Sequence, residues 1–320
     1  MALGEFDLIR RFFTRQPVRH ASTALGVGDD CALLRCAAGA ELAVTVDTLV
    51  SGVHFLPEVE PDSLGHKALA VNLSDLAAMG AEPRWATLAL TLPGIDEGWL
   101  AAFARGLFAL AERHGVEIVG GDTTRGPLSI TIQAMGWVPE GRALRRSGAR
   151  PGDGVYVSGP IGSAGLGLKQ RLGQTEFQDA AALARLERPE PRVALGLQLR
   201  GLASACIDVS DGLAADLGHI LAASNVGATL DCAALPLADG VARYIATTGD
   251  WAMPLGAGDD YELCFTVPED RRDELARRLA GAGLAAFPIG RIEAEPGLRL
   301  LKEGRLIDLN PSGYEHFSRT

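Results

Sequence analysis

Apolar residues recur at regular spacings along the first 138 residues, and the spacing changes several times from helical to extended. Helical periodicity predicts three helices, over residues 3–15, 66–79 and 97–114. Continuous or alternating apolar runs predict four strands, over residues 42–46, 85–92, 116–119 and 129–136. The first of these strands is expected to end at Asp47. Helices and strands therefore alternate through this half, which indicates an α/β or α+β domain.

The pattern breaks at residues 139–154, a stretch rich in Gly, Pro and Arg. We interpret it as a linker between a first domain over residues 1–138 and a second domain over residues 155–320. The second domain is predicted to contain strands over 155–158, 205–209 and 259–268, with short strands in the tail. Its helices are predicted directly after the Gly-rich run 159–168 and over 193–203, 212–223 and 269–282. This half is therefore also expected to be α/β.

Charge and composition narrow the class of protein. The 320 residues carry a net charge of −10, which argues against a nucleic-acid partner and against an anionic membrane surface. No apolar run reaches the roughly 18 residues that a membrane span needs. The N-terminal residues include Glu5 and Asp7 and lack the apolar core of a signal peptide. The five cysteines form no C-x-x-C pair, which favours reduced thiols in a cytoplasmic protein.

Seven aspartates lie in short patches that also contain Gly, Ser or Thr, each beside an apolar run. They are Asp29, Asp30, Asp47, Asp75, Asp122, Asp208 and Asp211. Any one of them taken alone is best explained as a turn residue, because Asp side chains hydrogen-bond to nearby backbone. Five separate patches of the same design favour a joint role, since gathered carboxylates repel one another unless a cation lies between them. Hard oxygen ligands select Mg²⁺ or Ca²⁺, so the pattern predicts a divalent-metal site and phosphate chemistry.

The common phosphate-binding motifs do not occur in the sequence. There is no G-x-x-x-x-G-K-[ST] motif and no protein-kinase H-R-D or D-F-G set, so nucleotide chemistry would have to use metals and arginines. The Gly-rich run at 159–168 fits either a phosphate loop or close helix packing. Arg142, Arg145 and Arg146 fit either triphosphate binding or a solvated linker. A lone histidine such as His54 is more often structural than functional.

Several of these segments, taken in order, resemble the thiamine-monophosphate kinase family of the aminoimidazole-ribonucleotide-synthetase-like superfamily. The matching motifs are G-E-F-D-L-I, N-L-S-D-L-A-A-M-G-A-E-P, G-G-D-T-T-R-G-P, R-S-G-A-R-P-G-D, I-D-V-S-D-G-L, D-Y-E-L and G-Y-E-H-F. The metal motifs are common to the superfamily, whereas the N-terminal motif, the S-G-V-H-F loop and the tail are more specific to this family. Selenophosphate synthetases and hydrogenase-maturation proteins match less well, because the sequence lacks the cysteine-bearing segments that mark them.

The resemblance implies ATP-dependent phosphorylation of thiamine monophosphate to thiamine diphosphate with several Mg²⁺ ions. It also implies an N-terminal α/β domain whose sheet pairs with that of a second copy in a homodimer, and a C-terminal mixed-sheet α/β domain. By family position, the metal ligands are Asp30, Thr45, Val46, Asp47, Asp75, Asp122, Asp208 and Asp211. The expected ATP contacts are Gly121, Asp122, Arg146 and Ser210, and the expected thiamine phosphate contacts are His54, Asp259 and Tyr314.

Two positions depart from the family pattern. Asp259 stands where Glu is usual, so its carboxylate is one methylene closer to the backbone. Val46 stands where a hydroxyl residue is frequent, so it offers a metal only its backbone carbonyl. Asp29 leaves the metal set, because the family pattern puts the ligand at Asp30.

The implied acceptor is itself a phosphate monoester, at least partly dianionic at pH 7 because its second pKa is about 6. The transfer therefore needs no general base, and no catalytic His or Lys is assigned. Positioning and electrostatic stabilisation by the metal-binding carboxylates would carry the reaction. Two alternatives stay open: another ATP-dependent enzyme of the superfamily, of the aminoimidazole-ribonucleotide-synthetase type, and a non-catalytic Mg·ATP-binding protein.

Overall fold

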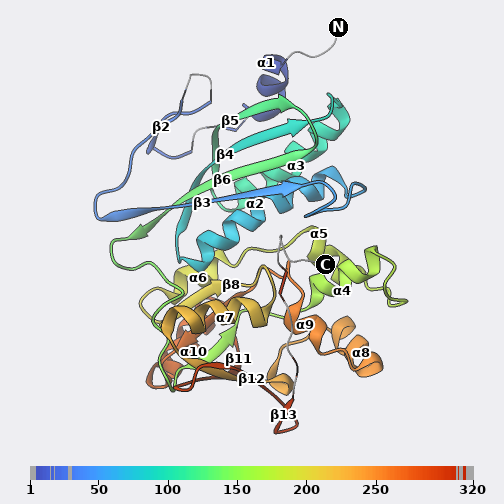
Figure 1. Cartoon of the computed structure of the whole chain (residues 1–320). Helices are drawn as coiled ribbons and strands as arrows, with labels where there is room; N and C mark the ends of the chain where they lie inside the picture. The colour runs from blue at the N-terminus through green and yellow to red at the C-terminus, as the bar shows by residue number, and fades with distance from the viewer. Residues whose placement is uncertain are drawn as a thin grey trace. The chain divides into compact units, whose positions relative to one another are not determined.

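The structure is a computed structural model that describes residues 5–14, 16–17, 19–27, 31–307, 309 and 313–314. Contacts between residues divide the chain into two compact units (Figure 1). The first unit comprises residues 1–76 and 81–141, and the second comprises residues 77–80 and 142–320. The domain boundaries predicted from the sequence, with a linker over 139–154, stay a prediction.

A four-stranded sheet forms the centre of the first unit, in the order β3-β6-β4-β5. Its strands are β3 (Ala40–Val50), β4 (Glu82–Leu92), β5 (Glu117–Arg125) and β6 (Ser129–Pro139). β6 is antiparallel to both of its neighbours, whereas β4 and β5 are parallel and are joined through helix α3 (Glu97–Arg113). A parallel pair needs such a crossover. The 11-residue strand β3 lies at one edge of the sheet.

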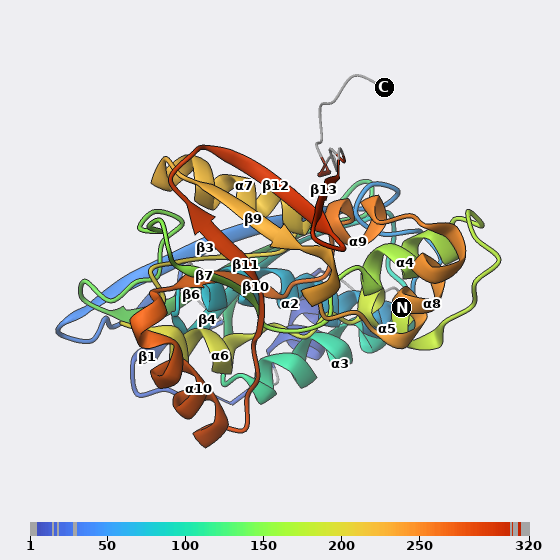
Figure 2. The ribbon, with the colours of Figure 1, turned by 90° about the horizontal axis from the view of Figure 1, so that it is seen from below.

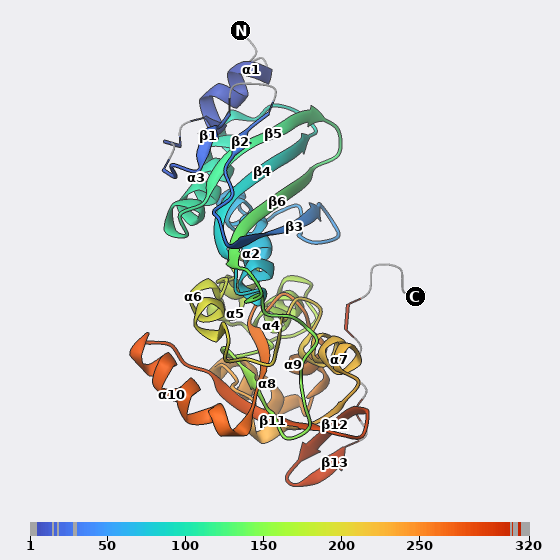
Figure 3. The ribbon, with the colours of Figure 1, turned by 90° about the vertical axis from the view of Figure 1, so that its left-hand side faces the viewer.

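Helices α2 (Pro61–Ala78) and α3 lie against one face of this sheet (Figure 3). The two helices approach each other closely, because a Cβ atom on Gly106 would lie 1.8 Å from the carbonyl oxygen of Asp62. Only glycine fits such a contact. Four short segments complete the unit: α1 (Glu5–Leu8), the π-helical η1 (Ile9–Phe13), β1 (Thr23–Leu25) and β2 (Leu33–Leu34).

A seven-stranded mixed sheet forms the centre of the second unit, in the order β13-β12-β9-β11-β7-β10-β8 (Figure 2). Its strands are β7 (Gly154–Val157), β8 (Ala205–Asp208), β9 (Gly227–Asp231), β10 (Leu263–Val267), β11 (Phe287–Glu293), β12 (Gly297–Lys302) and β13 (Arg305–Ile307). β9 and β12 are parallel, and the other neighbouring pairs are antiparallel. The core of this unit joins sheet residues such as Val155 and Ile207 to Leu217 and Ile220 of helix α7 (Leu213–Ser224).

The remaining helices of the second unit are α4 (Ser163–Arg171), α5 (Ala180–Glu187), α6 (Val193–Leu199), η2 (Cys232–Ala234), α8 (Asp239–Thr248), α9 (Ala252–Gly256), η3 (Glu269–Arg271) and α10 (Arg272–Gly281). α4 and α5 pack closely, since a Cβ atom on Gly167 would lie 2.6 Å from the carbonyl oxygen of Ala182. At Gly167, the Gly-rich run at 159–168 therefore serves helix packing; whether the run also binds phosphate stays a prediction. Of the helices that the structure describes, none is long and apolar enough to cross a membrane.

The expected alternation of helices and strands in two α/β parts is confirmed, but three predicted strand boundaries near the candidate site are wrong. The strand expected over 116–119 continues to Arg125, so Asp122 lies within β5. The strand expected to end at Asp47 continues to Val50, because Asp47 is paired within the sheet opposite Ile132. The strand expected over 259–268 begins only at Leu263, because residues 259 and 261 donate backbone hydrogen bonds to the loop after β8.

Candidate active site

A threonine and two acidic side chains come together in the first unit. Thr45 and Asp47 alternate on β3, and their side chains point to the face that α2 covers. The Thr45 hydroxyl donates a hydrogen bond to the carboxylate of Asp75 on α2. Burial, together with the negative charge of Asp75, raises the pKa of Asp47 to about 6. The fold therefore holds two carboxylates and a hydroxyl where a cation would relieve the repulsion between the carboxylates, and these oxygen donors fit Mg²⁺.

Asp122 is held on the opposite face of the same sheet. Asp47 on β3 lies in register with Gly121 on β5 through Ile132 and Leu88. Asp122, which is paired with Ala89, is the next residue along β5, so its side chain points to the other face. Gly121 precedes it with a φ of +153°, and a Cβ atom there would lie 1.9 Å from the carbonyl oxygen of Leu88. Glycine is thus required beside Asp122. The exposed Asp122 does not join the Asp47 and Asp75 pair within this unit.

In the second unit, the D-V-S-D-G segment forms a loop between β8 and α7 that is fixed by a residue the sequence reasoning missed. The backbone N–H groups of Ser210, Asp211 and Gly212 donate to one oxygen of Asp216, at 3.0, 3.0 and 3.1 Å. Asp216 is buried in the first turn of α7, and this burial raises its pKa to about 7. The signal that would have found it is an Asp in the first helical turn after a glycine, a typical partner for free N–H groups.

Two predicted substrate residues lie beside this loop. The N–H of Asp259 donates to the carbonyl oxygen of Ser210 at 2.8 Å, and the N–H of Tyr314 donates to that of Asp211 at 3.1 Å. A Cβ atom on Gly258 would lie 2.2 Å from the Ser210 carbonyl oxygen, so the approach depends on glycine. The second unit thus brings together Ser210, Asp211, Asp259 and Tyr314.

The other predicted residues have separate positions. His54 accepts the N–H of Val50 through Nδ1 at 3.0 Å, which closes the turn after β3. Val46 lies on the exposed face of β3, and the exposed Arg146 follows the Gly141 boundary of the first unit. Asp208, at the end of β8, is buried. Asp30 lies outside the described residues. The functional roles of His54, Val46, Arg146, Asp208 and Asp30 stay predictions.

No three His, Cys, Asp or Glu side chains are gathered so that they could hold a metal ion within the part of the chain that the structure describes. Asp47 and Asp75 by themselves offer two carboxylates, which are oxygen ligands of the type that Mg²⁺ prefers, and a metal-binding role for them stays a prediction.

Comparison with known proteins identifies the two domains of the chain and several similar proteins. Residues 28–138 match the model for the N-terminal domain of AIR synthase related proteins, and residues 150–303 match that for the C-terminal domain. The thiamine-monophosphate kinase of Escherichia coli strain K12 is 49% identical over 323 residues, which cover 99% of each chain.

Two solved structures are similar to the whole chain. The crystal structure of thiamine-monophosphate kinase from Stenotrophomonas maltophilia K279a has a TM-score of 0.84 and is 46% identical, with 96% of this chain and 99% of that chain covered. The structure of AaThiL complexed with AMPPCP and TMP has a TM-score of 0.77 and is 31% identical, with 98% and 97% covered.

Proposed function

This chain belongs to the thiamine-monophosphate kinase family of AIR-synthase-related proteins, and from that premise we propose that it transfers the γ-phosphoryl group of ATP to thiamine monophosphate. The products are thiamine diphosphate and ADP. The observation that carries this proposal is the AaThiL structure, which holds AMPPCP and TMP and is similar to this chain over nearly its whole length. The enzyme is thus a phosphotransferase whose acceptor is a phosphate group.

Residues of both units take part in the proposed reaction. In the first unit, Thr45, Asp47, Asp75, Asp122 and the carbonyl of Val46 bind Mg²⁺, with Asp30 as a further ligand. Gly121 and Asp122 of the first unit are proposed ATP contacts. In the second unit, Asp208 and Asp211 bind Mg²⁺, and Arg146 and Ser210 are proposed ATP contacts. His54, Asp259 and Tyr314 contact thiamine monophosphate. The shared position of Ser210, Asp211, Asp259 and Tyr314 supports this assignment for the second unit.

The proposed mechanism is direct in-line transfer without a general base. The acceptor phosphate is already nucleophilic, so the difficulty is to bring two polyanions together. When bound, several Mg²⁺ ions would neutralise the phosphate oxygens. The carboxylates of the protein hold these charges in fixed positions, and the guanidinium of Arg146 pairs with the triphosphate. The mechanism requires no His or Lys, which fits the predominance of aspartates among the proposed site residues.

We further propose that the enzyme is a cytoplasmic homodimer whose sheets pair through the first unit. β3 is a long edge strand, and it exposes Leu42, Val44 and Val46 on one face by 44, 53 and 59%. Apolar edge strands are sites of association unless they are covered. The dimer therefore explains why three aliphatic side chains alternate on the open face of β3.

Val44→Lys is expected to convert the dimer to a monomer, because a charge would be buried in the interface between the sheets. Analytical ultracentrifugation measures the change, from the mass of two chains to the 33.6 kDa of one. Leu306→Lys is the matched control, since Leu306 is at least as exposed but lies on β13. Equal masses for wild type and Val44→Lys would contradict an interface on this face of β3.

Product analysis tests the proposed activity. Purified enzyme with ATP, Mg²⁺ and thiamine monophosphate is expected to form thiamine diphosphate and ADP in equal amounts, and to form neither after chelation of Mg²⁺. Formation of ADP and free phosphate from other acceptors, with no thiamine diphosphate, would favour an enzyme of the aminoimidazole-ribonucleotide-synthetase type. Binding of ATP with no ADP formed would indicate a non-catalytic protein.

A further inference from the structure

The segment before β10 contains two residues in a backbone conformation that their side chains disfavour. Of the described residues other than glycine, four have a clearly positive φ: Asn225, Asp259, Tyr261 and Glu303. Asn225 ends α7 and Glu303 lies in the turn between β12 and β13, where this conformation is common. Asp259 (φ +67°) and Tyr261 (φ +51°) have no such role. Each costs about 1–3 kcal/mol, which persists only where the surroundings enforce it.

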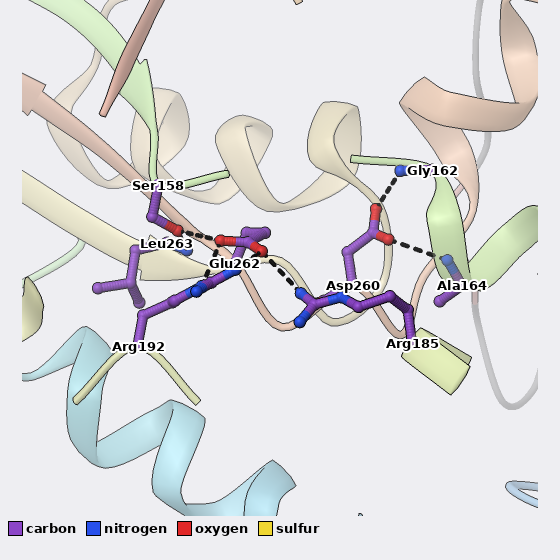
Figure 4. Close-up of polar contacts among 8 residues, drawn as sticks. All are labelled: Ser158, Gly162, Ala164, Arg185, Arg192, Asp260, Glu262 and Leu263. Atoms are coloured by element: carbon purple, nitrogen blue, oxygen red, sulfur yellow. Dashed lines mark hydrogen bonds and ion pairs between the residues drawn. The ribbon is translucent and has the colours of Figure 1, made fainter. Parts of the chain in front are cut away.

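Two buried acids alternate with these residues and enforce the conformation (Figure 4). The carboxylate of Asp260 accepts the N–H groups of Gly162 and, at 3.2 Å, Ala164, which begin helix α4. The carboxylate of Glu262 accepts hydrogen bonds from Arg185 at 2.7 Å, from Nε of Arg192 at 2.7 Å, and from Ser158. Residues 260 and 262 are thus fixed by backbone N–H groups at the start of α4, by the Ser158 hydroxyl just after β7, and by arginines on α5 and just before α6.

Backbone hydrogen bonds tie the same segment to the D-V-S-D-G loop. The N–H of Asp259 donates to the Ser210 carbonyl and that of Tyr261 to the Val209 carbonyl, both at 2.8 Å. The N–H of Val209 donates in turn to the Glu262 carbonyl at 2.7 Å. The backbone therefore sets the position of Asp259 relative to Ser210. The direction in which the Asp259 carboxylate points depends on side-chain contacts.

The buried Tyr261 fixes that direction. Its hydroxyl donates a hydrogen bond to Oδ1 of Asp259, two residues earlier in the chain, at 3.0 Å. Tyr261 makes this contact with a positive φ. We propose that Tyr261 is a positioning residue, which orients the carboxylate of Asp259 toward the organic part of the acceptor substrate. This rests on the proposed function, in which Asp259 contacts thiamine monophosphate.

The chemistry of a carboxylate says which part of the acceptor it meets. A negative carboxylate repels the phosphate group and attracts a cationic ring or an amino group. Thiamine monophosphate offers both, in its thiazolium ring and its aminopyrimidine. Since the Asp side chain has a single methylene group, the hydrogen bond from Tyr261 restricts the rotation of the Asp259 carboxylate and so the direction from which such a partner meets it.

Tyr261→Phe tests the proposal, because it removes the hydroxyl and keeps the buried ring. The KM and the Kd for thiamine monophosphate are expected to rise about tenfold, as for the loss of a hydrogen bond to a charged group, whereas the KM for ATP and the Tm change little. Tyr244→Phe is the matched control, since the Tyr244 hydroxyl donates to Asp250 at 2.8 Å in the same unit. It is expected to leave both KM values unchanged.

A double-mutant cycle shows whether Tyr261 acts through Asp259. In an Asp259→Ala background, Tyr261→Phe is expected to have no further effect on the Kd for thiamine monophosphate. Additive effects, or an unchanged Kd in Tyr261→Phe alone, would overturn the proposal. A wild-type protein that binds thiamine monophosphate but forms no thiamine diphosphate would refute the proposed function instead. In that case the Kd values, measured by isothermal titration calorimetry, would still decide the role of Tyr261.

Discussion

Asp211→Asn is expected to lower kcat by about 10²–10⁴, with little change in Tm. The asparagine keeps the shape of the side chain but removes the negative charge that a Mg²⁺ ligand supplies. Metal ions contribute several kcal/mol to the stabilisation of a phosphoryl-transfer transition state, and each 1.36 kcal/mol corresponds to a factor of ten in rate. The loop keeps its form, because Asp216 and Tyr314 hold it through backbone atoms that the substitution leaves in place.

The measurement is the rate of thiamine diphosphate formation across a Mg²⁺ titration, together with Mn²⁺ binding followed by electron paramagnetic resonance. Asp231→Asn is the matched control, since Asp231 is an exposed aspartate of the same unit that caps η2 through the N–H of Ala233. A kcat close to that of wild type in Asp211→Asn at saturating Mg²⁺ would refute the role of Asp211 as a metal ligand.

The sequence predicts elements well where one periodicity runs without interruption. The helix over 97–114 is found at Glu97–Arg113, and the strand over 85–92 lies inside Glu82–Leu92. The strand prediction fails at Asp47, because a polar residue in the middle of a strand looks like a strand end unless the helix that faces it is known. Asp75 on α2 faces this part of β3, where it accepts a hydrogen bond from the hydroxyl of Thr45 and raises the pKa of Asp47, and nothing in the local sequence of β3 indicates it.

The sequence indicates which residue types the candidate site would use, but it indicates much less about the residues that hold them in position. Patches of glycine and aspartate make Asp122 and Asp211 candidates, because five such patches beside apolar runs favour a joint role over five separate turns; that role stays a prediction. Asp216 was missed although it lies in the first helical turn after a glycine, four to six residues from the N–H groups whose hydrogen bonds it accepts. Tyr261 escapes such reasoning, since its contact with Asp259 occurs with a positive φ. A backbone conformation that bulky side chains disfavour is enforced by tertiary contacts, and these cannot be inferred from local propensity.

Arg192→Met is expected to lower the free energy of unfolding of the second unit by about 3 kcal/mol. The guanidinium of Arg192 forms a bidentate pair with Glu262, whose side chain is fully buried. Removal of one partner leaves a buried carboxylate with less compensation, and such losses typically cost about 3–5 kcal/mol. Arg185 still contacts Glu262, which puts the expected cost at the lower end of that range.

Thermal unfolding measures this loss as a decrease in Tm of roughly 6–12 °C for a unit of this size. Arg243→Met is the control, because the Arg243 side chain is 69% exposed and lies 3.7 Å from Asp179; such surface pairs contribute about 0–1 kcal/mol. Arg192→Lys should recover only part of the stability, since lysine keeps the charge but not the two parallel hydrogen bonds. Equal Tm values for Arg192→Met and Arg243→Met would mean that Glu262 does not depend on this pair. The strained conformation of Asp259 and Tyr261 would then have to be held by Asp260, by the backbone and by the contacts of Glu262 with Arg185 and Ser158.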